Sequence, residues 1–332
     1  MSRGRKTEMN TKKRTLRFNA DGKFRILMVS DIQETLTYDK RTPKALRALI
    51  DHVKPDLMIL GGDNCDGRKV KTREELKEYL DIFTAPMQET DTPFIHVYGN
   101  HDHDVSIPAS EQSELYESYS ACISGHSPEG VPGTSNYATL IYAHDSDKVK
   151  FCIYAFDTHH KNAELRPGVS TESLLLPNKY KPMRKWDIIR FEQQMWYWNL
   201  SKELEDREGE KVRAMAVMHV VPHEAALTMK NPAETSLKGA ADETLQCGVL
   251  NSGFFATVLQ RGDVDIIAAG HSHEDTIDAV YGGVRFCLDG CAGFSPYGID
   301  EIRGGRVFEI SEDGSHETYM VAYNDIMDIT NQ

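Results

Sequence analysis

The chain of 332 residues contains 40% hydrophobic and 27% charged residues, an ordinary composition for a globular protein with one large α/β domain. Its formal net charge of −13 argues against a general nucleic-acid-binding protein, because such a protein needs a basic face. Since no apolar run approaches the roughly 20 residues of a membrane-spanning helix, we also expect no membrane partner.

The N-terminal residues and the cysteines bear on the domain boundary and the compartment. Residues 1–17 are basic and polar without an apolar stretch, which predicts a disordered tail or a leader strand rather than a signal peptide. We therefore expect a single domain over residues 18–325. The six cysteines include no Cys-x-x-Cys pair, which predicts reduced thiols in a cytoplasmic protein.

The first hundred residues have a β-α-β-α-β pattern. Apolar runs and helical spacings predict strands over 24–30, 57–60 and 94–98, with helices over 43–53 and 72–87. Thr42 is the expected N-cap of the first helix. The three strands end in polar clusters: Asp31 and Gln33, Asp63 and Asp66, and Asn100 and His101. Because right-handed crossovers bring the ends of parallel strands to one edge, we expect these clusters to meet.

The middle of the chain predicts a different arrangement. Residues 137–142 and 149–156 read as an antiparallel pair, and the loop 159–185 is a candidate lid. Helical spacing predicts helices over 111–122, 186–205 and 252–260.

Two further apolar strands precede histidines. The strand 213–218 ends in His219, and the strand 264–269 is followed by Gly270-His271-Ser272-His273. The C-terminal part predicts four more strands, over 276–280, 284–288, 306–310 and 318–322. Together these elements predict one domain with two packed sheets.

Five polar clusters thus follow five apolar strands. Carboxylates, imidazoles and amide oxygens together suit Zn, Fe or Mn ions. Two such ions about 3.5–4 Å apart can share one carboxylate and bind both oxygens of a displacement at phosphorus. A lone acid at a strand end is more often a helix cap, but five clusters in this order predict a metal centre with Asp63 as the bridging acid. His223 is an alternative to His219, which we favour because it directly ends its strand.

The motifs Gly99-Asn100-His101-Asp102 and Gly270-His271-Ser272-His273 resemble those of the calcineurin-like metallophosphoesterases, and the resemblance extends over residues 25–298. Residues 18–24, 291–294 and 306–309 and the spacing His219-x-x-Pro222 are similar to the branch that contains purple-acid-phosphatase-like proteins and fungal cell-cycle phosphatases. The resemblance implies a four-layer α/β/β/α sandwich with two mixed sheets and a dinuclear centre of Mn, Fe or Zn.

The resemblance also implies a role for each candidate residue. The first ion would be bound by Asp31, Asp63 and His273, with Gln33 beside them, and the second by Asp63, Asn100, His219 and His271. His101 would be the general acid, with its ring donating a hydrogen bond to Asp66. A hydroxide bridging the two ions would be the nucleophile.

The sequence departs from the family pattern at two positions. Most calcineurin-like members have histidine where this chain has Gln33, so the first ion is expected to bind more weakly or to differ in identity. Purple acid phosphatases have tyrosine where this chain has Asp66, so we expect no purple colour.

Three functions remain open from the sequence. We favour a phosphomonoesterase that acts on a phosphorylated small molecule or a phosphoprotein. A phosphodiesterase could use the same centre, and a scaffold that binds metal without catalysis is a third possibility. Arg68, Asp102 and His103 could contact substrate, whereas His159 and His160 are expected to be solvated loop residues.

Overall fold

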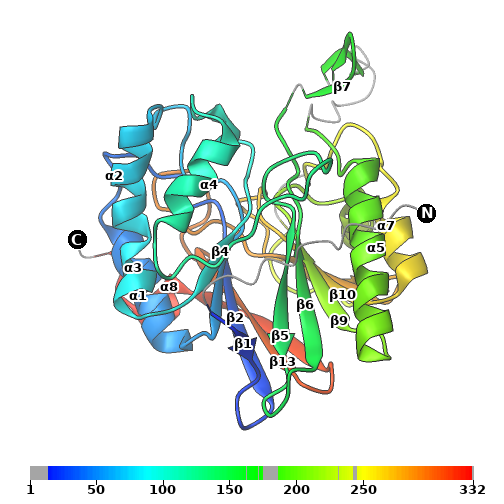
Figure 1. The fold of residues 1–332 in the computed structure, drawn as a ribbon. Coiled ribbons are helices and arrows are strands. Elements are labelled where there is room, and N and C mark those ends of the chain that lie inside the picture. The colour runs from blue at the N-terminus through cyan, green and yellow to red at the C-terminus, as the bar shows by residue number, and fades with distance from the viewer. Residues whose placement is uncertain are drawn as a thin grey trace.

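Two β-sheets lie face to face at the centre of the fold, and helices cover their outer faces (Figure 1). This computed structural model describes residues 14–161, 163–170, 172–174, 186–230, 232–241 and 245–330. The four layers of helix, sheet, sheet and helix are those expected from the resemblance. None of the described helices is long and apolar enough to span a membrane.

The five-stranded sheet carries the first three polar clusters. Its order is β14-β13-β2-β3-β4, with β2 (Lys23–Val29), β3 (Leu57–Leu60), β4 (Phe94–His96), β13 (Gly304–Ser311) and β14 (His316–Ala322). The strands β2, β3 and β4 are parallel, and β13 and β14 are antiparallel additions. Val29 pairs with Leu60, and Leu60 pairs with His96, so the parallel strands end side by side.

The seven-stranded sheet carries the two histidine clusters. Its order is β1-β5-β6-β9-β10-β12-β11, with β1 (Leu16–Arg17), β5 (Tyr137–Tyr142), β6 (Val149–Ala155), β9 (Arg213–Val217), β10 (Val264–Ala269), β11 (Asp278–Tyr281) and β12 (Val284–Leu288). The strands β6, β9, β10 and β12 are parallel, whereas β5 and β6 form the predicted antiparallel pair. Val217 pairs with Ala268, so β9 and β10 also end together.

Alternating side chains divide the core into three parts. Ile26 and Met28 of β2 point between the sheets, where they join residues such as Met215 and Ile266. Leu27, which lies between them, points outward to the helices. Both faces of β2 are therefore apolar from Ile26 to Val29, which explains the uninterrupted hydrophobic run of these four residues.

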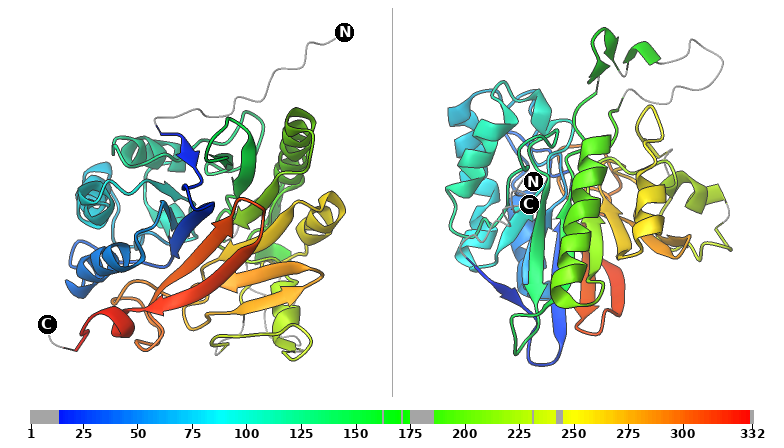
Figure 2. Two further views of the ribbon diagram at one scale, coloured as in Figure 1. Left: turned by 90° about the horizontal axis from the view of Figure 1, so that it is seen from below. Right: turned by 45° about the vertical axis from the view of Figure 1, so that its right-hand side comes forward.

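Helices enclose the two outer faces (Figure 2). One side has α1 (Arg41–Val53), α2 (Arg73–Phe83), α3 (Ala85–Glu89), α4 (Ala109–Glu117) and α8 (Tyr323–Ile326). The other side has α5 (Phe191–Glu208), α6 (Ala225–Lys230) and α7 (Phe254–Arg261). A small hairpin of β7 (Glu164–Arg166) and β8 (Val169–Ser170), followed by a 3₁₀ turn (Glu172–Leu174), projects from the body (Figures 1 and 2).

Several predicted helix boundaries were wrong. Thr42 is inside α1 rather than its N-cap, and its hydroxyl donates a hydrogen bond to Glu34 2.6 Å away. The predicted helix 72–87 is divided at Thr84 between α2 and α3, because Pro86 cannot donate a backbone hydrogen bond. The helix predicted from residue 186 begins at Phe191. The helices α6 and α8 were not predicted.

The predicted tail and lid lie only partly within the described chain. Residues 1–13 are outside the described residues, and Leu16 and Arg17 pair with β5, which agrees with the leader strand considered for this segment. The loop 159–185 contains the hairpin β7–β8, and its residues 162, 171 and 175–185 are outside the described residues.

Candidate metal centre

Two buried carboxylates follow β2 and β3. Asp31 and Asp63 are 0% and 1% exposed, and both have left-handed backbones with φ of 53° and 47°. Backbone hydrogen bonds connect the two loops, from Asp31 N to Gly62 O and from Gln33 N to Asp63 O, each 3.0 Å long. The sheet therefore fixes the two acids beside each other, as the parallel strand ends predicted.

Histidines from the other sheet meet these carboxylates. The Nδ1–H of His219 donates to Gly61 O at 3.0 Å, which directs Nε2 toward the acids, 3.2 Å from Asp63 Oδ2. The ring of His271 lies 5.0 Å from that of His219, centroid to centroid. Ligand atoms of Asp63, His219 and His271 all lie within 4.8 Å of one another. His223, the alternative to His219, instead bonds to Gly248 O.

His273 lies on the Asp31 side of the cluster. Its Nε2 is 3.1 Å from Asp31 Oδ1, and its Nδ1–H donates to Tyr297 O at 2.8 Å. The Tyr297 ring stacks on the imidazole at a centroid distance of 4.1 Å. A Cβ on Gly270 would lie 2.6 Å from Asp31 Oδ2, so this glycine permits the close approach of the two loops.

The donor atoms fit divalent metal ions. Two buried atoms at this place, Asn100 Oδ1 and His271 Nε2, have neither a hydrogen-bond nor an ion-pair partner among the described residues. Asp31 Oδ1 and His219 Nε2 make no hydrogen bond of good geometry there and contact His273 and Asp63 of the same cluster. A buried polar atom without a partner costs about 1–3 kcal/mol. The carboxylate, imidazole and amide atoms together form the mixed donor set that suits Mn, Fe or Zn.

The charges of the cluster are strongly coupled. Burial opposes the protonated form of His219, but Asp63 and Asp31 outweigh burial and raise its pKa to about 9. Burial alone would raise the pKa of Asp63, but the His219 imidazolium outweighs it and holds that pKa well below its usual value. Burial lowers the pKa of His271 to about 3, so this ring is neutral and its lone pair is available to a metal ion.

An open pocket of about 660 Å³ gives access to the cluster. Its lining includes the predicted residues Gln33, Asp63, Asp66, Asn100, His101, His271 and His273. Trp186 and Gln246 also line it, and the Trp186 ring contacts the His271 ring edge-on at 4.6 Å. Loop residues such as Trp186 and Tyr297 could not be assigned to the site from strand patterns.

The predicted hydrogen bond between His101 and Asp66 is absent, and this part of the prediction was wrong. Asp66 instead accepts hydrogen bonds from Arg68, with its Oδ1 2.7 Å from the Arg68 Nε. The Nδ1–H of His101 donates to Asp104 Oδ2 at 2.8 Å. The missed signal was the i, i+3 spacing of His101 and Asp104, because side chains three residues apart lie above one another in a 3₁₀ turn.

The backbone of the motif 99–102 is bound to the cluster as well. His101 N donates to Asp63 Oδ1 at 2.6 Å. Asp102, a candidate substrate contact, is 1% exposed and accepts a hydrogen bond from Gly99 N at 2.8 Å. Its carboxylate therefore holds the loop rather than facing the pocket.

Two facing mixed sheets with this edge cluster define a metallophosphoesterase fold. The chain belongs to the calcineurin-like phosphoesterase family, whose model matches residues 24–275. The resemblance found in the sequence is thereby confirmed.

Individual relatives support the same branch. The chain is 26% identical over 330 residues to probable inactive purple acid phosphatase 14 of Arabidopsis thaliana, which covers 90% of this chain and 77% of that protein. It is 24% identical over 282 residues to phosphatase DCR2 of Saccharomyces cerevisiae, covering 76% of this chain and 44% of that protein. Among solved structures, a dimetal phosphatase from Danio rerio is similar with a TM-score of 0.56 at 15% identity, covering 90% of this chain and 98% of that one.

Proposed function

We propose that the protein is a phosphomonoesterase with two divalent ions of the Mn, Fe or Zn class. The observation that carries the proposal is the buried cluster of carboxylate, imidazole and amide atoms, which faces an open pocket that also contains His101. Asp31, Asp63 and His273, with Gln33 beside them, would hold one ion. Asp63, Asn100, His219 and His271 would hold the other. When bound, the ions would supply an activated water and neutralise phosphate charge.

His101 would be the general acid for the leaving oxygen. Its Nδ1–H is occupied by Asp104, so Nε2 is the atom that can give a proton to substrate. Its backbone nitrogen is bound to Asp63, which keeps the acid next to the metal ligands. A positioned acid of this kind contributes about 10²–10⁴-fold to a rate.

The pocket rim favours an anionic substrate. Arg68 and Lys69 line the pocket beside Asp66, and the Arg68 side chain is 55% exposed. A guanidinium can bind two phosphate oxygens at once, so Arg68 is a candidate contact for the phosphoryl group. A pocket of this openness suits a phosphorylated small molecule or a phosphoprotein, and a diester on the same centre is the alternative reaction.

A metal-binding scaffold without catalysis is a second candidate. It is favoured by the names of the Arabidopsis relatives, which are called probable inactive, and by the neutral Gln33 at a position of the expected first metal. His101 supports the enzyme instead, because a scaffold has no need of an acid at the pocket.

The test combines elemental analysis with two substrates. Purified protein reconstituted with Mn, Fe or Zn is assayed on p-nitrophenyl phosphate and on bis-p-nitrophenyl phosphate. We expect about two ions per chain and faster hydrolysis of the monoester. Hydrolysis of the diester alone would favour the phosphodiesterase, and bound metal without hydrolysis of either would favour the scaffold.

A substitution of the acid makes the test specific. His101→Ala should leave metal content unchanged and lower turnover by roughly 10²-fold or more. His52→Ala, at an exposed position of α1, is the matched control and should change neither.

A further inference from the structure

A short 3₁₀ turn, Asp102–Asp104, follows His101 directly, and its three side chains bind three different segments. Asp102 is directed to its own sheet, where it accepts hydrogen bonds from Gly99 N at 2.8 Å and from Cys65 N at 3.1 Å. The turn is therefore fixed to the loop that carries Asp63.

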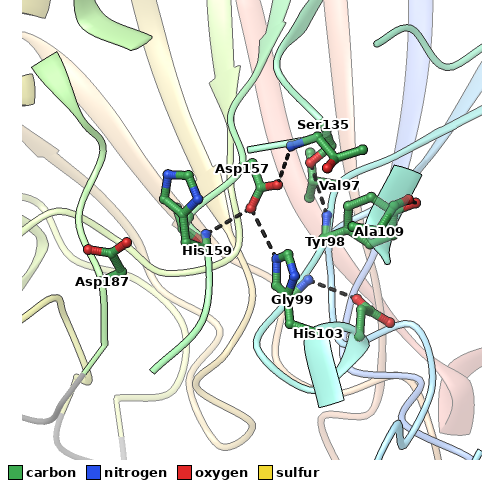
Figure 3. Close-up of polar contacts among 12 residues, drawn as sticks. Val97, Tyr98, Gly99, His103, Ala109, Ser135, Asp157, His159 and Asp187 are labelled. Atoms are coloured by element: carbon green, nitrogen blue, oxygen red, sulfur yellow. Dashed lines mark hydrogen bonds and ion pairs between the residues drawn. The ribbon is translucent and has the colours of Figure 1, made fainter. Parts of the chain in front are cut away.

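The second side chain of the turn crosses to the other sheet. His103 Nε2–H donates to Asp157 Oδ1 at 3.2 Å, and Asp157 follows β6 (Figure 3). Asp157 is fully buried and also accepts hydrogen bonds from Thr134 N at 2.7 Å and His159 N at 2.8 Å. Burial opposes the charge of His103, but Asp157 outweighs it and raises the His103 pKa, so the contact favours the charged form of this ring.

The third side chain connects the proposed acid to the same loop. Asp104 accepts one hydrogen bond on each oxygen, from His101 Nδ1–H at 2.8 Å and from His160 Nε2–H at 3.0 Å. His160 was expected to be a solvated loop residue, but its side chain is only 30% exposed and its ring lies 6.2 Å from that of His103.

We infer that Asp104 and His160 are positioning residues: Asp104 holds the His101 ring, and His160 holds Asp104 from the side of the opposite sheet. The Asp104 carboxylate accepts the Nδ1–H of His101 and so fixes the tautomer and orientation of that ring, and His160 fixes the orientation of the carboxylate. The contact of His103 with Asp157 holds the same turn at a second point. The inference rests on the proposed function, because it assigns His101 the role of acid.

The kinetic test compares kcat on two substrates whose leaving groups differ in how much they need protonation. A nitrophenolate leaves without much help, whereas the alcohol of β-glycerophosphate must be protonated as it leaves. Asp104→Asn keeps the shape of the side chain but removes its charge. We expect it to lower kcat about 10-fold to 100-fold more on β-glycerophosphate than on p-nitrophenyl phosphate, with metal content unchanged.

His160 and a control complete the series. His160→Gln should lower kcat in the same direction with a smaller effect. His52→Gln, on the exposed side of α1, should leave kcat on both substrates unchanged. An equal loss on both substrates, or no loss with Asp104→Asn, would overturn the inference.

A second readout is independent of turnover. Long-range ¹⁵N–¹H spectra of the zinc-loaded protein report which ring nitrogen carries the proton, and His101→Gln identifies the His101 signals. We expect a proton on Nδ1 of His101 in the wild type and loss of this preference in Asp104→Asn. A His101 ring protonated only on Nε2 in the wild type would refute the inference. If the wild type carries the Nδ1 proton but hydrolyses neither substrate, the proposed function is refuted and the inferred positioning of the ring is not.

Discussion

Replacing Asn100 by alanine would separate metal binding from folding. Asn100 is 2% exposed, and its amide oxygen has no hydrogen-bond partner. In the metal-free protein this oxygen is destabilising, because a buried acceptor without a partner costs about 1–3 kcal/mol. Asn100 borders the open pocket, so truncation leaves no enclosed cavity. We expect Asn100→Ala to raise the unfolding free energy of the chelated protein by about 1–3 kcal/mol.

The same substitution should weaken the stabilisation that metal provides. Replacing a residue that hydrogen-bonds to a metal ligand lowers the metal affinity about 10–100-fold. Loss of the ligand Asn100 itself is therefore expected to lower the affinity about 100-fold. A ligand that binds only the folded state stabilises it in proportion to the logarithm of its affinity. At saturating metal, the metal-induced gain in unfolding free energy should therefore be smaller by about 2.8 kcal/mol in Asn100→Ala.

The assay is urea unfolding of both proteins with EDTA and with excess zinc or manganese. Asn136→Ala is the matched control, since Asn136 is equally buried but bonds to Pro132 O at 2.7 Å and accepts from Asp157 N at 3.0 Å. This control should destabilise the protein equally under both conditions. If Asn100→Ala destabilises the chelated protein as the control does and leaves the metal-induced gain unchanged, Asn100 is a structural residue and the reasoning fails.

Three further substitutions test other parts of the structure. Gln33→His should raise the affinity for the weaker ion by about 10-fold or more, measured by equilibrium dialysis, and an unchanged affinity would contradict the assignment of this position. Gly270→Ala should destabilise the protein by about 1–3 kcal/mol and lower its metal content, because the new Cβ would displace Asp31. Normal metal content in that variant would contradict the role of the close approach. The pKa of His103 is raised above its unfolded value of about 6.5, so the stability from its pair with Asp157 is full below pH ~6.5 and is lost as pH rises through the folded pKa. With chelator present, His103→Gln should cost about 3 kcal/mol at pH ~6 and less at higher pH, and a cost independent of pH would refute the ion pair.

The strands that carry the candidate ligands could be predicted because both of their faces are buried. Their sequences end in uninterrupted apolar runs, and β10 occupies the predicted residues 264–269 although it contains the half-buried Asp265. Parallel pairing then brought Asp31 and Asp63 together, and did the same for His219 and His271.

The partner of His101 could not be predicted by the same reasoning. Asp66 and Asp104 both lie near His101 in the loops, and the choice depends on which acid has another cation within reach. Arg68 lies two residues after Asp66 and binds it, whereas Asp104 is brought under the ring by the 3₁₀ turn. Which of the two acids binds the His101 ring depends on loop conformation, and the spacing of apolar residues does not predict loop conformation.

The backbone offers a separate reason to treat Gln33 as part of the site. Of the eight non-glycine residues with positive φ in the described chain, four are the candidate metal-site residues Asp31, Gln33, Asp63 and His271. Such conformations cost about 1–3 kcal/mol each and persist where the surrounding structure requires them. Gln33 has φ of 42°, close to the 53° and 47° of the two acids. Gln33 therefore shares the strained backbone of Asp31 and Asp63, while its side chain offers a neutral amide oxygen in place of a carboxylate.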